Sequence, residues 1–98
     1  MPRIKLKIEY DGTNYVGWQV QRNGVSIQGE IEDSLKKIFN QEIKLYVAGR
    51  TDAGVHALSQ VAHFDVEKLS IKTEKIFRAL NFFLKKKKNK IRILESRI

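Results

Sequence analysis

Side chains of four different chemistries stand close together in the middle of the chain. They are a guanidinium, a hydroxyl, a carboxylate and an imidazole, from Arg50, Thr51, Asp52 and His56. Apolar residues alternate with other residues on both sides, over 42–48 and 59–66, which is the pattern of β-strands. A polar loop between two strands is where a rigid sheet can hold reactive groups toward a ligand. The sequence therefore places a candidate site in residues 48–57.

Three kinds of site could use these residues. The spacing of Gly49 and Gly54 resembles a phosphate-binding P-loop, but Val and His follow where that motif requires Lys and Ser or Thr. A metal could bind Asp52 and His56, yet the chain has no cysteine and only one other histidine, so a metal site would have too few ligands. The third is a carboxylate nucleophile or base, kept ionised by the guanidinium of Arg50.

A structural interpretation competes with all three. An aspartate near glycine in a polar loop usually forms a turn, and Arg–Asp pairs are usually surface salt bridges. On spacing alone, the structural interpretation is favoured over a site.

A resemblance over nearly the whole chain reverses that preference. Residues 49–57, GRTDAGVHA, resemble the active-site signature of the tRNA pseudouridine synthase A family. Residues 10–21, YDGTNYVGWQVQ, resemble the family's second block. The triplets SIQ at 26–28 and ALN at 79–81 match as well, and all the blocks stand in the family's order.

The resemblance implies an activity and a role for each matched residue. The family isomerises uridine to pseudouridine in the anticodon arm of tRNA, without a cofactor or a metal. Asp52 would be the catalytic carboxylate, and Arg50 would pair with it and help to hold the target base out of its stack. Whether Asp52 attacks the ribose or the base stays open. The side chains expected to contribute to substrate binding are Arg50, Thr51, His56, Tyr15 and Gln19.

Composition limits the class of protein. The 98 residues predict one small domain, 1–98. The 19 basic against 11 acidic residues give a net charge of +8, which suits a polyanion such as tRNA and equally a lysine-rich soluble surface. The lack of cysteine, of a signal peptide and of a long apolar run favours a cytoplasmic protein that has no membrane span.

The elements that must position the site follow from hydrophobic periodicity. Six are expected, in the order β-α-β-β-α-β: a strand over 3–10, a helix over 26–39, strands over 42–48 and 59–66, a helix over 73–84, and a last short strand that includes Ile91 and Ile93. This order predicts an α+β fold of the ferredoxin-like kind, in which two helices cover one face of a four-stranded antiparallel sheet.

Local signals add detail to both helices. Ser26 is expected to cap the first helix and Asn40 to end it, with Glu32–Lys36 and Asp33–Lys37 pairs on its solvent face. The second is expected to be capped by Ser70 or Thr73. Its core stripe would be Ile76, Leu80, Phe83 and Leu84. The lysines at 85–88 are expected to form an exposed turn.

The long connection over 11–25 has its own expectations. It combines Tyr15 and Trp18 with polar side chains, as RNA-contacting loops do. Trp18 is expected to fold back over the core. His63, in the strand after the candidate loop, is expected to be a partly buried structural residue.

The resemblance covers only the first half of the family's catalytic region. The missing half would supply a tyrosine, a further basic residue and most contacts of a homodimer, so this chain alone is expected to be inactive. The alternative is a non-catalytic RNA-binding module of the same fold. Against it, the third strand carries a single aromatic residue, Phe64, where RNA recognition motifs have an aromatic pattern.

Overall fold

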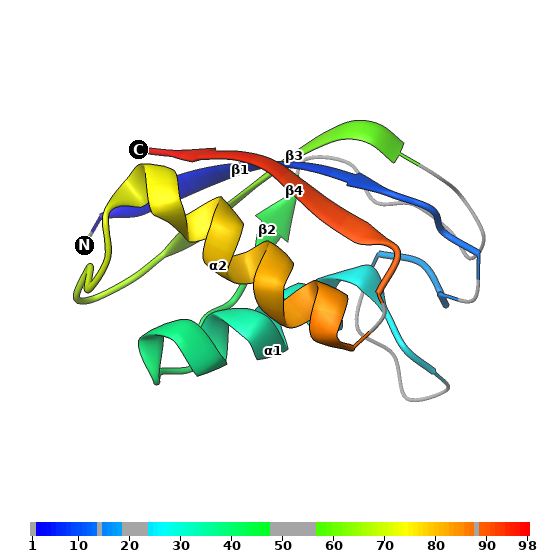
Figure 1. The fold of residues 1–98 in the computed structure, drawn as a ribbon, viewed down its shortest axis with the longest axis horizontal. Helices are drawn as coiled ribbons and strands as arrows, with labels where there is room; N and C mark the ends of the chain where they lie inside the picture. Colours follow the sequence, from blue (N-terminus) through cyan, green and yellow to red (C-terminus); the bar gives the residue numbers. More distant parts are fainter. Residues whose placement is uncertain (1, 14, 19–23, 48–56, 88) are drawn as a thin grey trace.

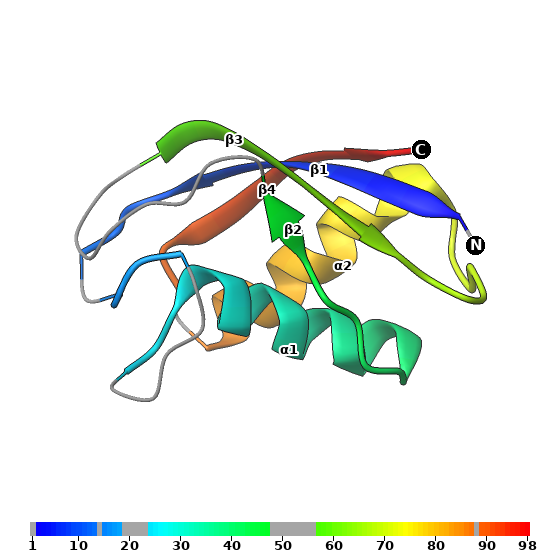
Figure 2. The ribbon, with the colours of Figure 1, turned by 180° about the vertical axis from the view of Figure 1, so that it is seen from behind.

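The computed structural model describes residues 2–13, 15–18, 24–47, 57–87 and 89–98. The elements in chain order are β1 (Arg3–Tyr10), α1 (Ile27–Phe39), β2 (Tyr46–Val47), β3 (Ala57–Asp65), α2 (Thr73–Lys86) and β4 (Ile91–Arg97). The described strands form one antiparallel sheet in the order β2-β3-β1-β4. Both helices lie on the same face of this sheet, and the two termini lie at the same end (Figures 1 and 2). The predicted ferredoxin-like α+β fold is confirmed.

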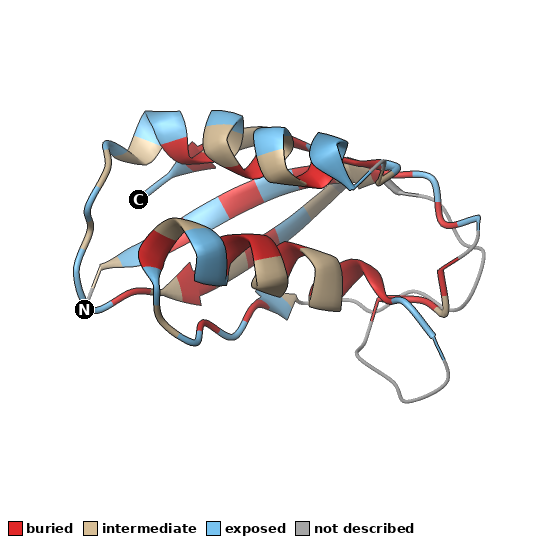
Figure 3. Cartoon of the chain, turned by 60° about the horizontal axis from the view of Figure 1, so that its bottom comes forward, coloured by how far each residue is buried: buried red, intermediate tan, exposed pale blue. Residues whose placement is uncertain are grey.

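Strand β1 forms the centre of the fold because its residues alternate strictly. Ile4, Leu6 and Ile8 are fully buried, whereas Lys5 and Lys7 are exposed on the other side. Burial of an aliphatic side chain of this size contributes about 1.5–3 kcal/mol. Figure 3 shows the other half of this core: both helices lie across one face of the sheet, and buried residues alternate with exposed ones along each helix. The layer between helices and sheet is therefore the hydrophobic core.

Helix α1 begins and ends as its sequence predicts. The Ser26 side chain accepts a hydrogen bond of 3.0 Å from the backbone N–H of Gly29. Asn40 has a φ of 54°, the left-handed conformation that asparagine tolerates well, and its N–H donates to the Lys36 carbonyl. Both caps satisfy backbone groups that a helix terminus leaves unpaired.

Of the two ion pairs predicted on α1, the structure contains one, and the prediction of the other is wrong. The Asp33–Lys37 pair is present at 3.8 Å, but Lys36 pairs with Glu42 at 2.6 Å instead of with Glu32. The carboxylate of Glu32 instead accepts a hydrogen bond from the backbone N–H of Leu45. A buried backbone donor requires a partner, so this contact prevails over a solvent-exposed pair of small net stability.

The same contact explains why β2 is shorter than predicted. The alternation over 42–48 correctly places Ile43 and Leu45 in the core. Leu45, however, directs its backbone N–H and C=O to side chains of α1, so β2 starts only at Tyr46, and within the described residues its ladder with β3 comprises Tyr46 and Val47. In this segment, residues that alternate into the core, such as Ile43 and Leu45, precede the residues that pair with β3.

The predicted caps of α2 are wrong as well. Lys72 precedes the helix and makes no side-chain capping bond. Instead, the buried Ser96 of β4 donates its hydroxyl to the Thr73 carbonyl at 2.6 Å and accepts from the backbone N–H of Phe77 at 3.0 Å. A hydroxyl from the sheet thus supplies the polar contact of the first turn, and no local sequence signal could indicate it.

The far end of α2 also differs from the prediction. The helix continues to Lys86, and Phe83 is only half-buried, outside the core cluster that includes Ile76, Leu80 and Leu84. Of the lysines expected in an exposed turn, those at 85 and 86 are exposed in the last helical turn, and Lys87 forms an ion pair with Asp33 of α1. Lys88 lies outside the described residues.

A bulge in β4 changes which residues face the helices. Lys7 pairs with Glu95, but the next residue, Ile8, pairs with Ile93, so Leu94 is an extra residue in β4. Ile91 and Ile93 are buried, as predicted. Beyond the bulge, Ser96 is the buried residue, and its two neighbours, Glu95 and Arg97, line the opposite face.

Candidate active-site region

The candidate catalytic segment has described residues at both of its ends. The predicted site residues Arg50, Thr51, Asp52 and His56, and also Gln19, lie outside the described residues. Val47 ends β2 and pairs with Ala62, and Ala57 begins β3 and pairs with Tyr10 of β1. The segment 48–56 thus joins two neighbouring strands of the sheet, as the sequence predicts.

Two side chains of α1 fix the backbone just before β2. The Gln28 amide donates to the Leu45 carbonyl at 3.3 Å and to the Glu32 carboxylate at 2.9 Å. Glu32 in turn accepts from the Leu45 N–H at 2.8 Å. Both polar groups of the Leu45 backbone are therefore held three residues before residue 48. This role is not evident from the sequence, although the SIQ match at 26–28 includes Gln28.

Tyr15, a predicted substrate-binding residue, lies in the core. Its hydroxyl donates to the Asn89 side chain at 2.6 Å and accepts from the backbone N–H of Lys90 at 3.0 Å. The Asn89 amide also donates to Glu30 of α1 at 2.8 Å. Burial raises the pKa of the Tyr15 phenol, against the opposing effect of the Lys90 bond. The described contacts of Tyr15 tie the connection after β1 to the end of α2, and its substrate contact stays a prediction.

Trp18 covers the core, as predicted. It is buried and lies against Tyr10, with ring centroids 6.2 Å apart. The preceding Gly17 has a φ of 112°, a conformation that favours glycine. The Val16 N–H donates to the Val25 carbonyl at 2.9 Å, so both sides of the undescribed residues 19–23 are bound together.

The ALN match contains a second side-chain clamp on a strand. Asn81 of α2 donates to the Ile93 carbonyl at 2.8 Å and accepts from the Ile93 N–H at 2.7 Å. Asn81 thus fixes β4 against α2, as Gln28 fixes the segment before β2 against α1. Both matched residues position strands of the sheet.

His63 is half-buried, as predicted, and stacks on Tyr46. Their rings are 5.5 Å apart and inclined by only 21°. Within the described ranges, no three His, Cys, Asp or Glu side chains are grouped as a metal site requires, and no helix could cross a membrane.

Comparison with known proteins identifies the family. A family described as tRNA pseudouridine synthase matches residues 7–96. This chain belongs to the tRNA pseudouridine synthase family. The match includes the segment 49–57 and all of the elements described above except the first half of β1 and the last residue of β4.

Individual relatives agree with this assignment. The chain is 54% identical over 85 residues to tRNA pseudouridine synthase A of Afipia carboxidovorans, which covers 87% of the chain and 34% of the relative. It is 66% identical over 68 residues to the protein of that name from Rhodopseudomonas palustris, covering 69% of the chain and 28% of the relative. It is 49% identical over 84 residues to tRNA pseudouridine synthase A of Brachyspira hyodysenteriae, which covers 86% of the chain and 34% of the relative. The chain spans about a third of the length of these relatives.

Proposed function

We propose that this chain carries the catalytic aspartate of an enzyme that isomerises uridine to pseudouridine in tRNA. The family match over residues 7–96, which contains the segment 49–57, is the observation that carries the proposal. Asp52 acts as the nucleophilic or basic carboxylate, and Arg50 keeps it ionised. The reaction breaks the bond between ribose and a ring nitrogen, turns the base and rejoins it through a ring carbon; that carbon loses its hydrogen as a proton, and the freed nitrogen gains a proton.

The frame around the segment supports this assignment. A catalytic group requires a rigid support, since small displacements reduce the rate steeply. The backbone of Leu45 is fixed by Gln28 and Glu32, and β3 lies centrally in the sheet. The backbone before the segment is therefore held by the contacts of Leu45 with α1, and the backbone after it by the pairing of β3 with β1, and neither depends on the substrate.

Substrate binding requires extrusion of the target base, at a cost of a few kcal/mol. Phosphate contacts from the cations of this basic chain offset that cost. We assign contacts with the extruded nucleotide to Arg50, Thr51, His56, Gln19 and Tyr15. The substrate is the anticodon arm of tRNA. The enzyme is a cytoplasmic homodimer that requires neither a cofactor nor a metal. Its activity requires the second half of the family's catalytic region.

The test is Asp52→Asn in the complete protein. Pseudouridine formation, measured by tritium release from labelled tRNA, should be abolished, whereas tRNA affinity should stay within a few-fold of wild type. Glu67→Gln, which removes an exposed carboxylate after β3, serves as the control and should retain full activity. Substantial turnover by Asp52→Asn would show that another group performs the chemistry.

A further inference from the structure

The face of the sheet opposite the helices carries a row of four side chains, one from each strand. Tyr46 of β2 pairs with His63 of β3, His63 pairs with Lys5 of β1, and Lys5 pairs with Arg97 of β4. Strands in a sheet are about 4.8 Å apart, so the row spans roughly 14 Å. That length accommodates about two nucleotides of an extended single strand.

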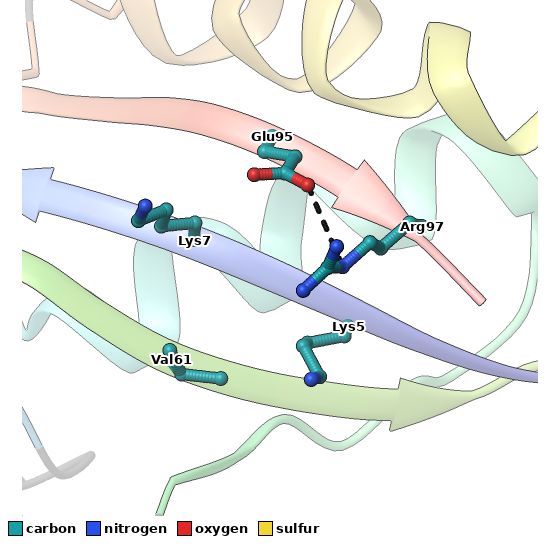
Figure 4. A pocket seen from close by; sticks show the side chains of 5 residues that line it. All are labelled: Lys5, Lys7, Val61, Glu95 and Arg97. Atoms are coloured by element: carbon teal, nitrogen blue, oxygen red, sulfur yellow. Dashed lines mark ion pairs between the residues drawn. The ribbon is translucent and has the colours of Figure 1, made fainter.

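The polar end of the row surrounds a hollow. Lys5, Lys7, Val61, Glu95 and Arg97 line this hollow of about 170 Å³ (Figure 4). Glu95 is the single carboxylate in the lining, and it pairs with Arg97 at 3.4 Å. Among the described residues, Lys5 and Lys7 form no ion pair, unlike Arg3, which makes two hydrogen bonds with Asp65 near the end of the same face. The centre of the face therefore carries excess positive charge.

The other end of the row is aromatic. Tyr46 is 46% exposed and stacks on His63, and the ammonium of Lys44 lies 5.6 Å from the centre of the Tyr46 ring. A lysine above an exposed ring is a weak contact that a nucleobase can replace. The displaced Lys44 would then stand beside the phosphate of the nucleotide whose base has taken its place.

We propose that Tyr46, His63, Lys5, Lys7 and Arg97, here called the sheet-face platform, bind an unpaired segment of RNA. One base stacks on the Tyr46–His63 pair, and the adjacent phosphates contact the three cations. Stacking surfaces beside a cationic hollow are what single-stranded nucleic acid requires. A protein partner fits less well, because the centres of protein interfaces are depleted in lysine. The identity of the RNA as tRNA rests on the proposed function, whereas the platform rests on the contacts above.

Two variants separate stacking from phosphate contacts. Binding of a fluorescent uridine-rich octanucleotide RNA is measured by anisotropy across a range of salt concentrations. Tyr46→Ala should weaken binding roughly tenfold with an unchanged salt dependence, and Tyr46→Phe should restore it, since stacking requires only the ring. Lys5→Ser with Lys7→Ser should reduce the slope of log affinity against log salt by about 1.4, because each phosphate contact in a single strand contributes about 0.7.

The matched control removes two positive charges elsewhere. Lys75 and Lys85 are exposed on α2. Lys75→Ser with Lys85→Ser should leave the salt slope unchanged, and an equal reduction would overturn the platform, because net charge alone would then explain binding. The platform would also be overturned if Tyr46→Ala left the RNA affinity unaltered. The same holds if that variant changed from dimer to monomer without an effect on RNA affinity. Thermal melting confirms that each variant is folded.

Failure of the platform and failure of the proposed function are distinguishable. If the complete wild-type protein forms no pseudouridine while Tyr46→Ala still loses octanucleotide affinity, the proposed function fails and the platform stands. If Asp52→Asn is inactive while the platform variants bind RNA as wild type does, the platform fails and the proposed function stands.

Discussion

The Glu32 carboxylate accepts a hydrogen bond of 2.8 Å from the backbone N–H of Leu45, and this contact links α1 to the strand that precedes the candidate catalytic segment. Gln28 completes the link by donating to the Leu45 carbonyl. Leu45 is itself buried, so its backbone groups cannot turn to water if these partners are removed. The position of β2 therefore depends on two polar side chains as well as on hydrophobic packing.

Replacement of either partner should reduce both stability and turnover. We expect Gln28→Ala and Glu32→Ala each to lower the free energy of unfolding by about 1–3 kcal/mol, because a buried backbone group loses its partner. In the complete enzyme, kcat should fall more than KM rises, since the clamp positions the catalytic segment and does not touch RNA. Denaturant titration and steady-state kinetics measure the two effects. Lys36→Ser, at an exposed ion pair on the same helix, should change neither; a loss of tRNA affinity alone in Glu32→Ala would contradict the positioning role.

Tyr15→Phe separates a structural from a substrate-binding tyrosine. The variant leaves the Asn89 side chain and the Lys90 N–H without the Tyr15 hydroxyl. We expect a loss of about 1–3 kcal/mol in unfolding free energy, measured by urea denaturation. Tyr46→Phe, at an exposed tyrosine, is the control and should be neutral. A raised KM with unchanged stability would instead assign the hydroxyl to the substrate.

The Asp33–Lys87 pair should make stability depend on pH at both extremes. Their mutual hydrogen bond, the largest cause, lowers the pKa of Asp33 below its ordinary 3.8 and raises the pKa of Lys87 above its ordinary 10.5. The stability that Asp33 contributes is fully present above the pKa of Asp33 in the unfolded chain, and it is lost as the pH falls through its lowered pKa in the folded chain. The stability that Lys87 contributes is fully present below the pKa of Lys87 in the unfolded chain, and it is lost as the pH rises through its raised pKa in the folded chain.

Unfolding of Lys87→Met across pH measures this dependence. Between the two pH extremes, the free energy of unfolding of wild type should exceed that of the variant by about 0.5 kcal/mol, as expected of a largely exposed pair. The difference should begin to decrease in acid near pH 3.8, vanish once the pH has fallen through the lowered folded pKa of Asp33, and vanish again in strong base. Lys85→Met, two residues earlier and without an ion pair among the described residues, should show no such profile. A difference that persisted in acid would mean that Lys87 stabilises through its alkyl chain.

Asn81→Ala should expose part of the β4 edge. Its side chain occupies both the N–H and the C=O of Ile93, and free groups of this kind allow pairing with another chain. We expect a loss of about 1–3 kcal/mol in unfolding free energy and increased self-association at high micromolar concentration, measured by light scattering. Asn40→Gly, which preserves a left-handed backbone, is the control and should not associate. An Asn81→Ala chain that associates no more than wild type would mean that the edge is protected in another way.

The fold was predictable because its core follows local periodicity. Ile4, Leu6 and Ile8 alternate, and Ile27, Ile31 and Leu35 recur at helical spacing, so each element's buried side was evident from its own residues. The failures share a different cause. The roles of Glu32 and Ser96 depend on partners 13 and 23 residues away, respectively, and no local pattern encodes such contacts.

The candidate site was predictable only through resemblance. The spacing of Arg50, Asp52 and His56 alone favoured a structural turn, and these residues lie outside the described part of the chain. Among the matched residues that the structure describes, Gln28 and Asn81 carry clamps that amino-acid type did not reveal. An amide can serve a ligand or a strand equally well, and only the fold determines which.

The bulge at Leu94 gives β4 a tolerance to changes in length. If Leu94 were deleted, Ile93 would still point inward, Ser96 would still reach the first turn of α2, and Arg97 would remain on the open face, because the ladder would become regular without exchanging sides. A deletion near the middle of β1 would instead turn half of its aliphatic residues into solvent. Relatives can therefore differ by one residue at this point of β4 while they keep the same residues on the core side and on the charged side.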